Sequence, residues 1–182
     1  IITYGSSLDN EGLFRYMAKQ PVPCVFIEGG PDNGNCNRIQ IDNEYGAYEA
    51  TRHLIAQGRK NIIHVTGDMN YTASLERLNG FVRAMRDSHI PITADSILYA
   101  DFFEESAYRQ ITGLLDRDIH PDAVFAGADK TAYGVLRALM NAGISIPGET
   151  AVIGFDDDTP DSRDIIFPGL STMRQPMYEM GC

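Results

Sequence analysis

Tryptophan is absent from this 182-residue sequence, and cysteine is scarce. The three cysteines, Cys24, Cys36 and Cys182, are scattered, and no two of them have the CxxC spacing of zinc-binding or redox motifs. An odd number of dispersed cysteines argues against a disulfide framework and is typical of proteins from a reducing compartment. We therefore expect a cytoplasmic protein.

Basic residues are also few, with 15 lysines and arginines against 25 aspartates and glutamates and a formal net charge of −10. Nucleic-acid binding requires clustered Lys and Arg side chains that neutralise phosphates. No apolar run approaches the ~20 residues that cross a bilayer. The sequence thus predicts that this chain by itself binds neither DNA nor a membrane. No leader precedes Ile1, and the chain opens on an apolar pair as though in mid-strand, so we expect both ends to be cut.

The sequence lacks the short motifs of common enzyme classes, namely GxGxxG, GxxxxGK[ST], HExxH and GxSxG. The histidines are dispersed, and none is spaced i, i+4 from another histidine or from a cysteine. His64 lies in the apolar run IIHV, which favours a histidine packed in the core over a metal ligand or a general base. We predict no catalytic residues, no metal site and no cofactor, although missing motifs weaken an enzymatic interpretation without excluding it.

What the sequence does contain is a regular alternation of short apolar runs with stretches of helical periodicity. The runs at 1–4, 24–27, 38–41, 62–66, 97–99, 123–126 and 151–155 are expected strands. Helices are expected at 9–19, from Asp42 or Asn43 to Gly58, over about four turns from Ser74, at 104–115, and from an Asp129 cap to 141. Such alternation predicts an α/β fold of parallel sheets flanked by helices, with a hinge near Ile41 and Asp42.

Carboxylates follow two of the expected strands directly. The stretch 147–158, PGETAVIGFDDD, is a buried strand that ends in acids, and Glu28 follows the strand CVFI. In an open parallel sheet, ligands lie just beyond the carboxyl ends of the strands, so Asp156 and Asp157 stand where a polar ligand would be held. Gly154 would let another backbone or a ligand come close. The plainer alternative is that these acids cap or solvate a loop.

Arg77 is expected in or near the first turn of its helix, where the macrodipole disfavours a cation. A carboxylate such as Asp156, or the hydroxyls of a ligand, would compensate it. The alternative is a surface arginine paired with the neighbouring Glu76. Asp129 is likewise open to two interpretations, because it is a good helix N-cap and also follows a parallel strand.

Two aromatic residues, Tyr71 and Phe102, lie in loops that follow expected strands. An aromatic face in that position can stack on the apolar face of a sugar, although loop aromatics also commonly close the core.

Four collinear segments resemble the lactose-repressor/galactose-repressor family of bacterial transcription regulators. They are residues 41–67 (IDNEYGAYEATRHLIAQGRKNIIHVTG), 74–85 (SLERLNGFVRAM), 121–157 (PDAVFAGADKTAYGVLRALMNAGISIPGETAVIGFDD) and 170–181 (LSTMRQPMYEMG). The resemblance implies the family's effector-binding core, in which a periplasmic-binding-protein-like pair of α/β lobes closes on a small molecule. It also implies that the helix-turn-helix, the hinge helix and part of the N-terminal lobe are missing.

Position by position, the resemblance places Tyr4 and Glu28 at strand ends of the N-terminal lobe, facing the cleft, and Gln175 at the second crossing between lobes. Arg77 is similar to the arginine of the family pattern Ser-x-x-Arg-x-x-Gly, and Phe102 to the aromatic residue that stacks on the ligand. These residues complete the candidate ligand-binding set, which is Tyr4, Glu28, Tyr71, Arg77, Phe102, Asp129, Asp156 and Gln175.

Within that set, Asp156 resembles the first acid of the family's Gly-Phe-Asp-Asp motif, which accepts hydrogen bonds from ligand hydroxyls. The sequence departs from the family pattern at Ala128, where an asparagine usually precedes the aspartate. The substitution removes an amide from the site and leaves the identity of the ligand open.

The expected architecture is a partial N-terminal lobe of residues 1–41, to which 173–182 cross back, and a C-terminal lobe of residues 42–172. We predict a sensing core that binds a small metabolite, expected to be a sugar, and acts as a homodimer on operator DNA through the missing N-terminal domain. The alternative is a periplasmic or lipid-anchored sugar-binding protein of an ABC transporter.

Overall fold

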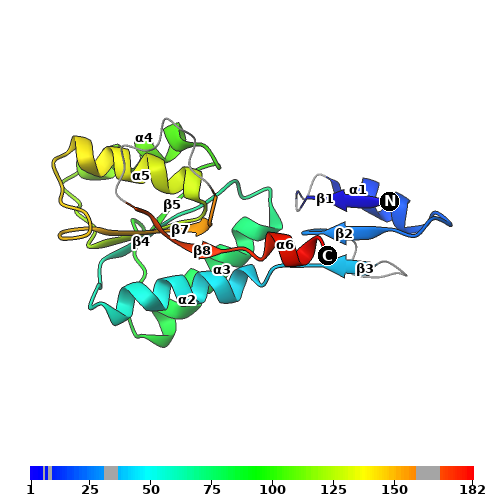
Figure 1. The fold of residues 1–182 in the computed structure, drawn as a ribbon. Coiled ribbons are helices and arrows are strands. Elements are labelled where there is room, and N and C mark those ends of the chain that lie inside the picture. Colours follow the sequence, from blue (N-terminus) through cyan, green and yellow to red (C-terminus); the bar gives the residue numbers. More distant parts are fainter. Residues whose placement is uncertain (6, 8–9, 31–36, 159–168) are drawn as a thin grey trace.

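The computed structural model describes residues 1–5, 7, 10–30, 37–158 and 169–182. It contains two separate parallel sheets (Figure 1). The smaller sheet has the order β1-β2-β3 and carries one helix from the same segment of chain. Its elements are β1 (Ile2–Tyr4), α1 (Glu11–Ala18), β2 (Val25–Ile27) and β3 (Asn37–Ile39).

The larger sheet has five parallel strands in the order β5-β4-β6-β7-β8. The strands are β4 (Ile62–Val65), β5 (Ile97–Leu98), β6 (Ala123–Ala126), β7 (Ala151–Asp156) and β8 (Ser171–Arg174). Helices α2 (Asn43–Ala56) and α3 (Thr72–Asp87) cover one face of this sheet, and α4 (Glu104–Leu115) and α5 (Asp129–Asn141) cover the other (Figure 1). This arrangement confirms the predicted α/β fold of parallel sheets flanked by helices.

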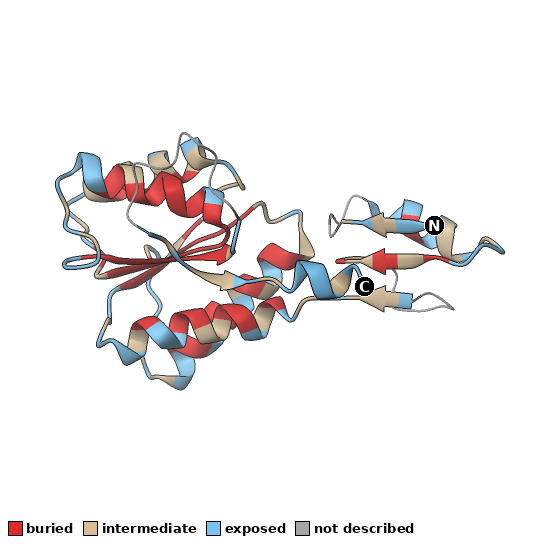
Figure 2. Cartoon of the chain, in the orientation of Figure 1, coloured by how far each residue is buried: buried red, intermediate tan, exposed pale blue. Residues whose placement is uncertain are grey.

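The core lies on both faces of the larger sheet, where β4, β6 and most of β7 are buried (Figure 2). A central parallel strand is covered by helices on both sides, so it needs a continuous apolar run rather than an alternating one. The sequences IIHV and AVFA meet this need. Leu54 and Phe81 pack on the face under α2 and α3, and Ile111 and Leu139 pack on the opposite face.

His64 is a core histidine, as predicted. It is fully buried in β4, and its ring stacks on Phe125 and Phe81, with centroids 4.7 and 5.4 Å away. Its Nδ1 donates to the carbonyl oxygen of Phe125 at 3.0 Å, whereas Nε2 has no partner among the described residues. Burial lowers the pKa of His64 to about 4, so the ring is neutral at physiological pH.

The predicted start of one helix and the predicted cap of another are wrong. Helix α3 begins at Thr72 instead of near Ser74, so Arg77 lies in the second turn. The unfavourable effect of the helix dipole on a cation is confined to the first turn, so it does not account for the partners of Arg77. Helix α5 begins at Asp129 itself, so the N-cap position is occupied by Ala128, which makes no side-chain capping hydrogen bond. The carboxylate of Asp129 is used elsewhere, as described below.

Two segments lead from the large sheet toward the small one (Figure 1). The first follows β3 and ends at Asp42, which caps α2 by accepting a hydrogen bond from the Tyr45 N–H at 2.9 Å. The second follows β8 and leads into the short helix α6 (Met177–Met180). Because Arg174 still pairs with Asp156 of β7, the chain leaves the large sheet after Arg174, two residues later than expected. In the described part of the chain, no helix has the length and apolar character to span a membrane.

Candidate ligand-binding site

A cavity of about 290 Å³ lies between the carboxyl ends of β2 and β7. Seven of the eight predicted binding residues line it, and Asp129 is the exception. The lining residues are Tyr4, Gly5, Glu28, Tyr71, Ala73, Arg77, Phe102, Asp156, Asp158, Gln175 and Met177. A wider hollow of about 470 Å³ also touches Glu28, but the other predicted binding residues are not among those that line it.

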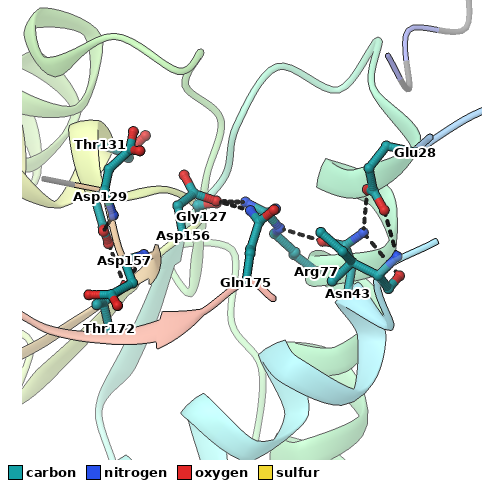
Figure 3. Close-up of polar contacts among 12 residues, drawn as sticks. Glu28, Asn43, Arg77, Gly127, Asp129, Thr131, Asp156, Asp157, Thr172 and Gln175 are labelled. Carbon is teal, nitrogen blue, oxygen red and sulfur yellow. Dashed lines mark hydrogen bonds and ion pairs between the residues drawn. The ribbon is translucent and has the colours of Figure 1, made fainter. Parts of the chain in front are cut away.

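Arg77 occupies the centre of the polar network behind this cavity (Figure 3). Its residue surface is only 5% exposed. Nη1 donates to the Gly127 carbonyl oxygen at 2.5 Å and to Asp156 Oδ1 at 3.3 Å, and Nε donates to Asn43 Oδ1 at 2.9 Å. The guanidinium lies 3.8 Å from the centre of the Phe155 ring, a cation–π contact. The predicted compensation by Asp156 is therefore present, and none of these contacts uses Nη2.

The alternative interpretation of Arg77, a surface ion pair with Glu76, is wrong. Arg77 is buried, and Glu76 instead accepts a hydrogen bond from Asn43 Nδ2 at 3.0 Å. Burial lowers the pKa of the Arg77 guanidinium, while the nearby carboxylates of Asp156 and Glu28 oppose that shift. An arginine keeps its proton throughout the physiological range, so Arg77 remains a fixed cation at the cavity.

Asp156 ends β7 and accepts hydrogen bonds from Arg77 Nη1 and from Gln175 Nε2 (Figure 3). Its side chain is 24% exposed. Burial raises the pKa of Asp156 to about 6, against the opposing effect of Arg77, and the carboxylates of Asp129 and Asp158 raise it further. At pH 7.5 the group is therefore an ionised acceptor, although it is held in that form at a free-energy cost.

Glu28 occupies the corresponding position at the end of β2 and is 8% exposed. Its Oε1 accepts from the Ile41 N–H at 2.5 Å, and its Oε2 accepts from Asn43 Nδ2 at 3.2 Å. Glu28 and Asp156 both have positive φ, 59° and 124°, which is uncommon for residues other than glycine. Such backbone strain at two strand ends that face one cavity is typical of functional sites.

The aromatic residues form one wall of the cavity. Tyr71 and Phe102 pack edge to face with their ring centroids 5.3 Å apart. A Cβ atom on Gly67 would lie 2.2 Å from Phe102 Cε1, so Gly67 is needed for Phe102 to reach this position. Tyr4 is 64% exposed, and its partial burial together with the charges of Glu28 and Asp156 raises its pKa. The Tyr4 hydroxyl is therefore a neutral donor and acceptor.

Asp129 lies behind the cavity and supports the loop after β7. Its Oδ1 accepts from the Thr172 hydroxyl at 2.6 Å, and its Oδ2 accepts from the Asp158 N–H at 2.9 Å. A Cβ atom on Gly154 would lie 2.2 Å from Asp129 Oδ1. Gly154 therefore allows the close approach of this carboxylate, where we expected a backbone or a ligand.

Asn43 was missed as a site residue, because the sequence presents it only as a second candidate for the cap of α2. It is 2% exposed and contacts both Glu28 and Arg77. The only sequence signal for Asn43 is that a polar residue stands directly after the predicted hinge, at the start of an amphipathic helix.

The cavity is suited to binding rather than to catalysis. Its described lining includes no serine, cysteine or histidine, so it lacks the paired nucleophile and base of covalent hydrolases. Among the described residues, no group of three or more His, Cys, Asp or Glu side chains could hold a metal ion. What the lining offers is hydrogen-bond acceptors, one buried cation and an aromatic wall.

Comparisons with known proteins agree with this description. The family model of the periplasmic binding protein-like domain matches residues 51–182. The HTH-type transcriptional repressor PurR of Actinobacillus pleuropneumoniae serotype 3 (strain JL03) is 34% identical over 161 residues, which cover 88% of this chain and 47% of that protein. The HTH-type transcriptional regulator DegA of Bacillus subtilis (strain 168) is 32% identical over 175 residues, 96% of this chain and 51% of that protein. The chain thus spans about half the length of these relatives.

Solved structures show the same relationship. A sugar-binding transcriptional regulator of the LacI family from Escherichia coli, complexed with phosphate, superimposes with a TM-score of 0.86 at 26% identity, covering 99% of this chain and 64% of that one. The transcriptional regulator CelR in complex with cellobiose gives a TM-score of 0.79 at 28% identity, with 93% and 59% covered. These relatives are transcription regulators and not enzymes, which supports the prediction of a non-enzymatic core. The chain belongs to the lactose-repressor/galactose-repressor (LacI/GalR) family, in which it corresponds to the periplasmic-binding-protein-like, effector-binding core.

Proposed function

We propose that this chain senses a small metabolite, a sugar, by binding it in the cavity between the two sheets. The observation that carries this proposal is that both sheets contribute to one cavity, with Tyr4 and Glu28 on one side and Arg77 and Asp156 on the other. A ligand that contacts both sides favours the arrangement in which they are close together. Binding can then bias the rest of a regulator only through its different affinities for the two arrangements.

The charges of the lining indicate which ligands fit. Glu28, Asp156 and Asp158 are three acids against the single cation of Arg77. Arg77 is already paired with Asp156, so an anionic ligand would meet uncompensated carboxylates. A neutral ligand rich in hydroxyl groups can instead donate to those oxygens and place an apolar face against Phe102. These features support an uncharged sugar over a sugar phosphate.

For the whole protein we propose a cytoplasmic regulator that binds operator DNA as a homodimer. The support comes from its relatives, which are HTH-type transcription regulators by name. DNA binding is assigned to a helix-turn-helix domain outside this chain, because the chain carries a net charge of −10. We propose lobes of residues 1–41, joined by the returning segment 175–182, and of residues 42–174.

A thermal-shift screen tests the binding proposal. The panel is D-glucose, D-galactose, D-ribose, cellobiose, adenosine, guanine and glucose 6-phosphate. A ligand at 100 times its dissociation constant adds about 2.7 kcal/mol to the free energy of unfolding, which raises Tm by roughly 5–11 °C for a chain of this size. We expect at least one neutral sugar to do so and glucose 6-phosphate to have no effect.

Two arginine variants of helix α3 provide the matched control. Arg77→Ala removes the buried cation and should reduce the shift to about half or less at the same ligand concentration, whereas Arg86→Ala removes an arginine whose side chain is 72% exposed and should leave it unchanged. An undiminished shift in Arg77→Ala would place the ligand outside this cavity. A shift with glucose 6-phosphate alone would contradict the proposed ligand class.

A further inference from the structure

Asn43 is the first residue of α2, directly after the segment that joins the two sheets. It is 2% exposed and does not line the cavity, yet it hydrogen-bonds two residues that do. Its Oδ1 accepts from Arg77 Nε at 2.9 Å, and its Nδ2 donates to Glu28 Oε2 at 3.2 Å (Figure 3). The buried side chain of Asn43 therefore connects Arg77, on a helix that packs against the large sheet, to Glu28 at the end of a strand of the small sheet.

The neighbours of Asn43 explain why an amide stands here. Glu28 approaches from the end of β2, Glu76 and Arg77 from α3, and the cap residue Asp42 precedes it. Nδ2 also donates to Glu76 Oε2 at 3.0 Å, so the amide supplies donors to two carboxylates and an acceptor to a guanidinium. An aspartate would keep the acceptor for Arg77 but would face two like charges. A leucine would leave all of these buried polar groups without this partner.

The same network reaches the other side of the cavity. Arg77 also hydrogen-bonds Asp156, and Asp156 accepts from Gln175, which lies between β8 and α6. Both segments that lead from the large sheet toward the small one are thus linked to Arg77, the first through Asn43 and the second through Asp156. The bonds join residues 34 and 79 positions apart in the chain, so they form only when the elements are packed together.

We propose that Asn43 is a positioning residue that couples the orientation of Arg77 in the cavity to the placement of the small sheet through Glu28. A change in the orientation of Arg77 then alters the hydrogen bond between Asn43 and Glu28, and movement of the small sheet alters the hydrogen bond between Asn43 and Arg77. The inference depends on the proposed function only for its regulatory meaning. The contacts themselves exist without a ligand, and they can be tested without one.

The test measures the distance between the two sheets in the intact, effector-free protein. Spin labels are attached to cysteines introduced at the exposed positions Lys19 and Arg86, after the native cysteines have been replaced. Double electron–electron resonance then gives the distance distribution from pH 8 to pH 4.5. The variants are N43D and N43L, and the matched control is Asn79→Asp, which places the same change at an exposed position of α3.

We expect a single narrow distribution in the unsubstituted protein and in Asn79→Asp at every pH. N43L should lose the narrow peak at every pH. N43D should lose it at pH 7.5 and regain it at low pH, because a protonated aspartate again offers a donor to Glu28 and an acceptor to Arg77. The unsubstituted protein at the same pH accounts for the titration of other groups, Asp156 among them.

Recovery at low pH is a result that a merely structural role for Asn43 would not produce. A narrow peak in N43D at pH 7.5, or a broad one that does not recover on acidification, would overturn the proposal. If N43L does not fold, as judged by circular dichroism, the pH series of N43D decides alone. Because no effector is present, failure of the sugar screen has no bearing on this outcome.

Discussion

Substitution of Asp156 by asparagine should stabilise the effector-free protein at neutral pH. Burial raises the pKa of Asp156 from 3.8 to about 6, so the folded protein binds this proton more tightly than the unfolded chain does. At about 1.4 kcal/mol for each pKa unit, holding the group ionised above pH 6 costs about 3 kcal/mol. Asparagine resembles the protonated acid and keeps an oxygen that can accept from Arg77 and Gln175.

The sign of the pH dependence follows from the same shift. Between pH 4 and pH 6 the folded state carries more protons at Asp156 than the unfolded state, so stability falls as the pH rises through this window. The advantage of Asp156→Asn should therefore be near zero at pH 4 and reach about 3 kcal/mol above pH 6, or roughly 6–12 °C in Tm. Positive φ at position 156 does not obscure the comparison, since asparagine tolerates this region as well as aspartate does.

Urea denaturation of both proteins from pH 4 to pH 8 measures this difference, with the midpoint compared at constant m-value. The control is Asp157→Asn, which removes the next carboxylate in the chain, a side chain that is 54% exposed. It should change the free energy of unfolding by no more than about 0.5 kcal/mol. A variant Asp156→Asn that is no more stable than the unsubstituted protein at pH 7.5, with a pH-independent difference, would refute the reasoning.

The other predictions concern affinity, pH, packing and DNA. Arg77→Ala should weaken effector binding roughly ten- to a hundred-fold by calorimetry, since it removes a charge-assisted hydrogen bond from the cavity. The protein should lose about 3 kcal/mol of stability as the pH falls from 6.5 to 4, because His64 binds a proton in the unfolded chain but stays neutral in the folded core. His64→Leu should abolish this loss, and an unchanged acid transition in the variant would contradict the prediction. Gly154→Ala should cost about 1–3 kcal/mol, because its Cβ would lie 2.2 Å from Asp129 Oδ1, whereas Gly113→Ala, with open space around it in α4, should gain about 0.5–1 kcal/mol. Residues 1–182 should not shift operator DNA in a gel, and a salt-sensitive, sequence-specific shift would refute the assignment of DNA binding to another domain.

The sequence alone determined the class of the fold and most of its elements. Helix α4 and strand β6 coincide with their predicted ranges, because apolar periodicity and turn residues act locally. The site could also be placed at the strand ends. Parallel strands bring their carboxyl ends to one edge, so acids that follow β2 and β7 identify that edge without knowledge of any contact.

Only the tertiary structure decided what each polar group touches. Asp129 and Asp156 both follow strands and look alike in the sequence, yet one supports a loop and the other lines the cavity. Arg77 was singled out through a helix start that proved wrong, and its actual partners come from other elements. Asn43 acquires its role only because Glu28 and Arg77 converge on it, 15 and 34 positions away in the chain. Side-chain partners depend on how distant elements pack, and local periodicity carries no information about that packing.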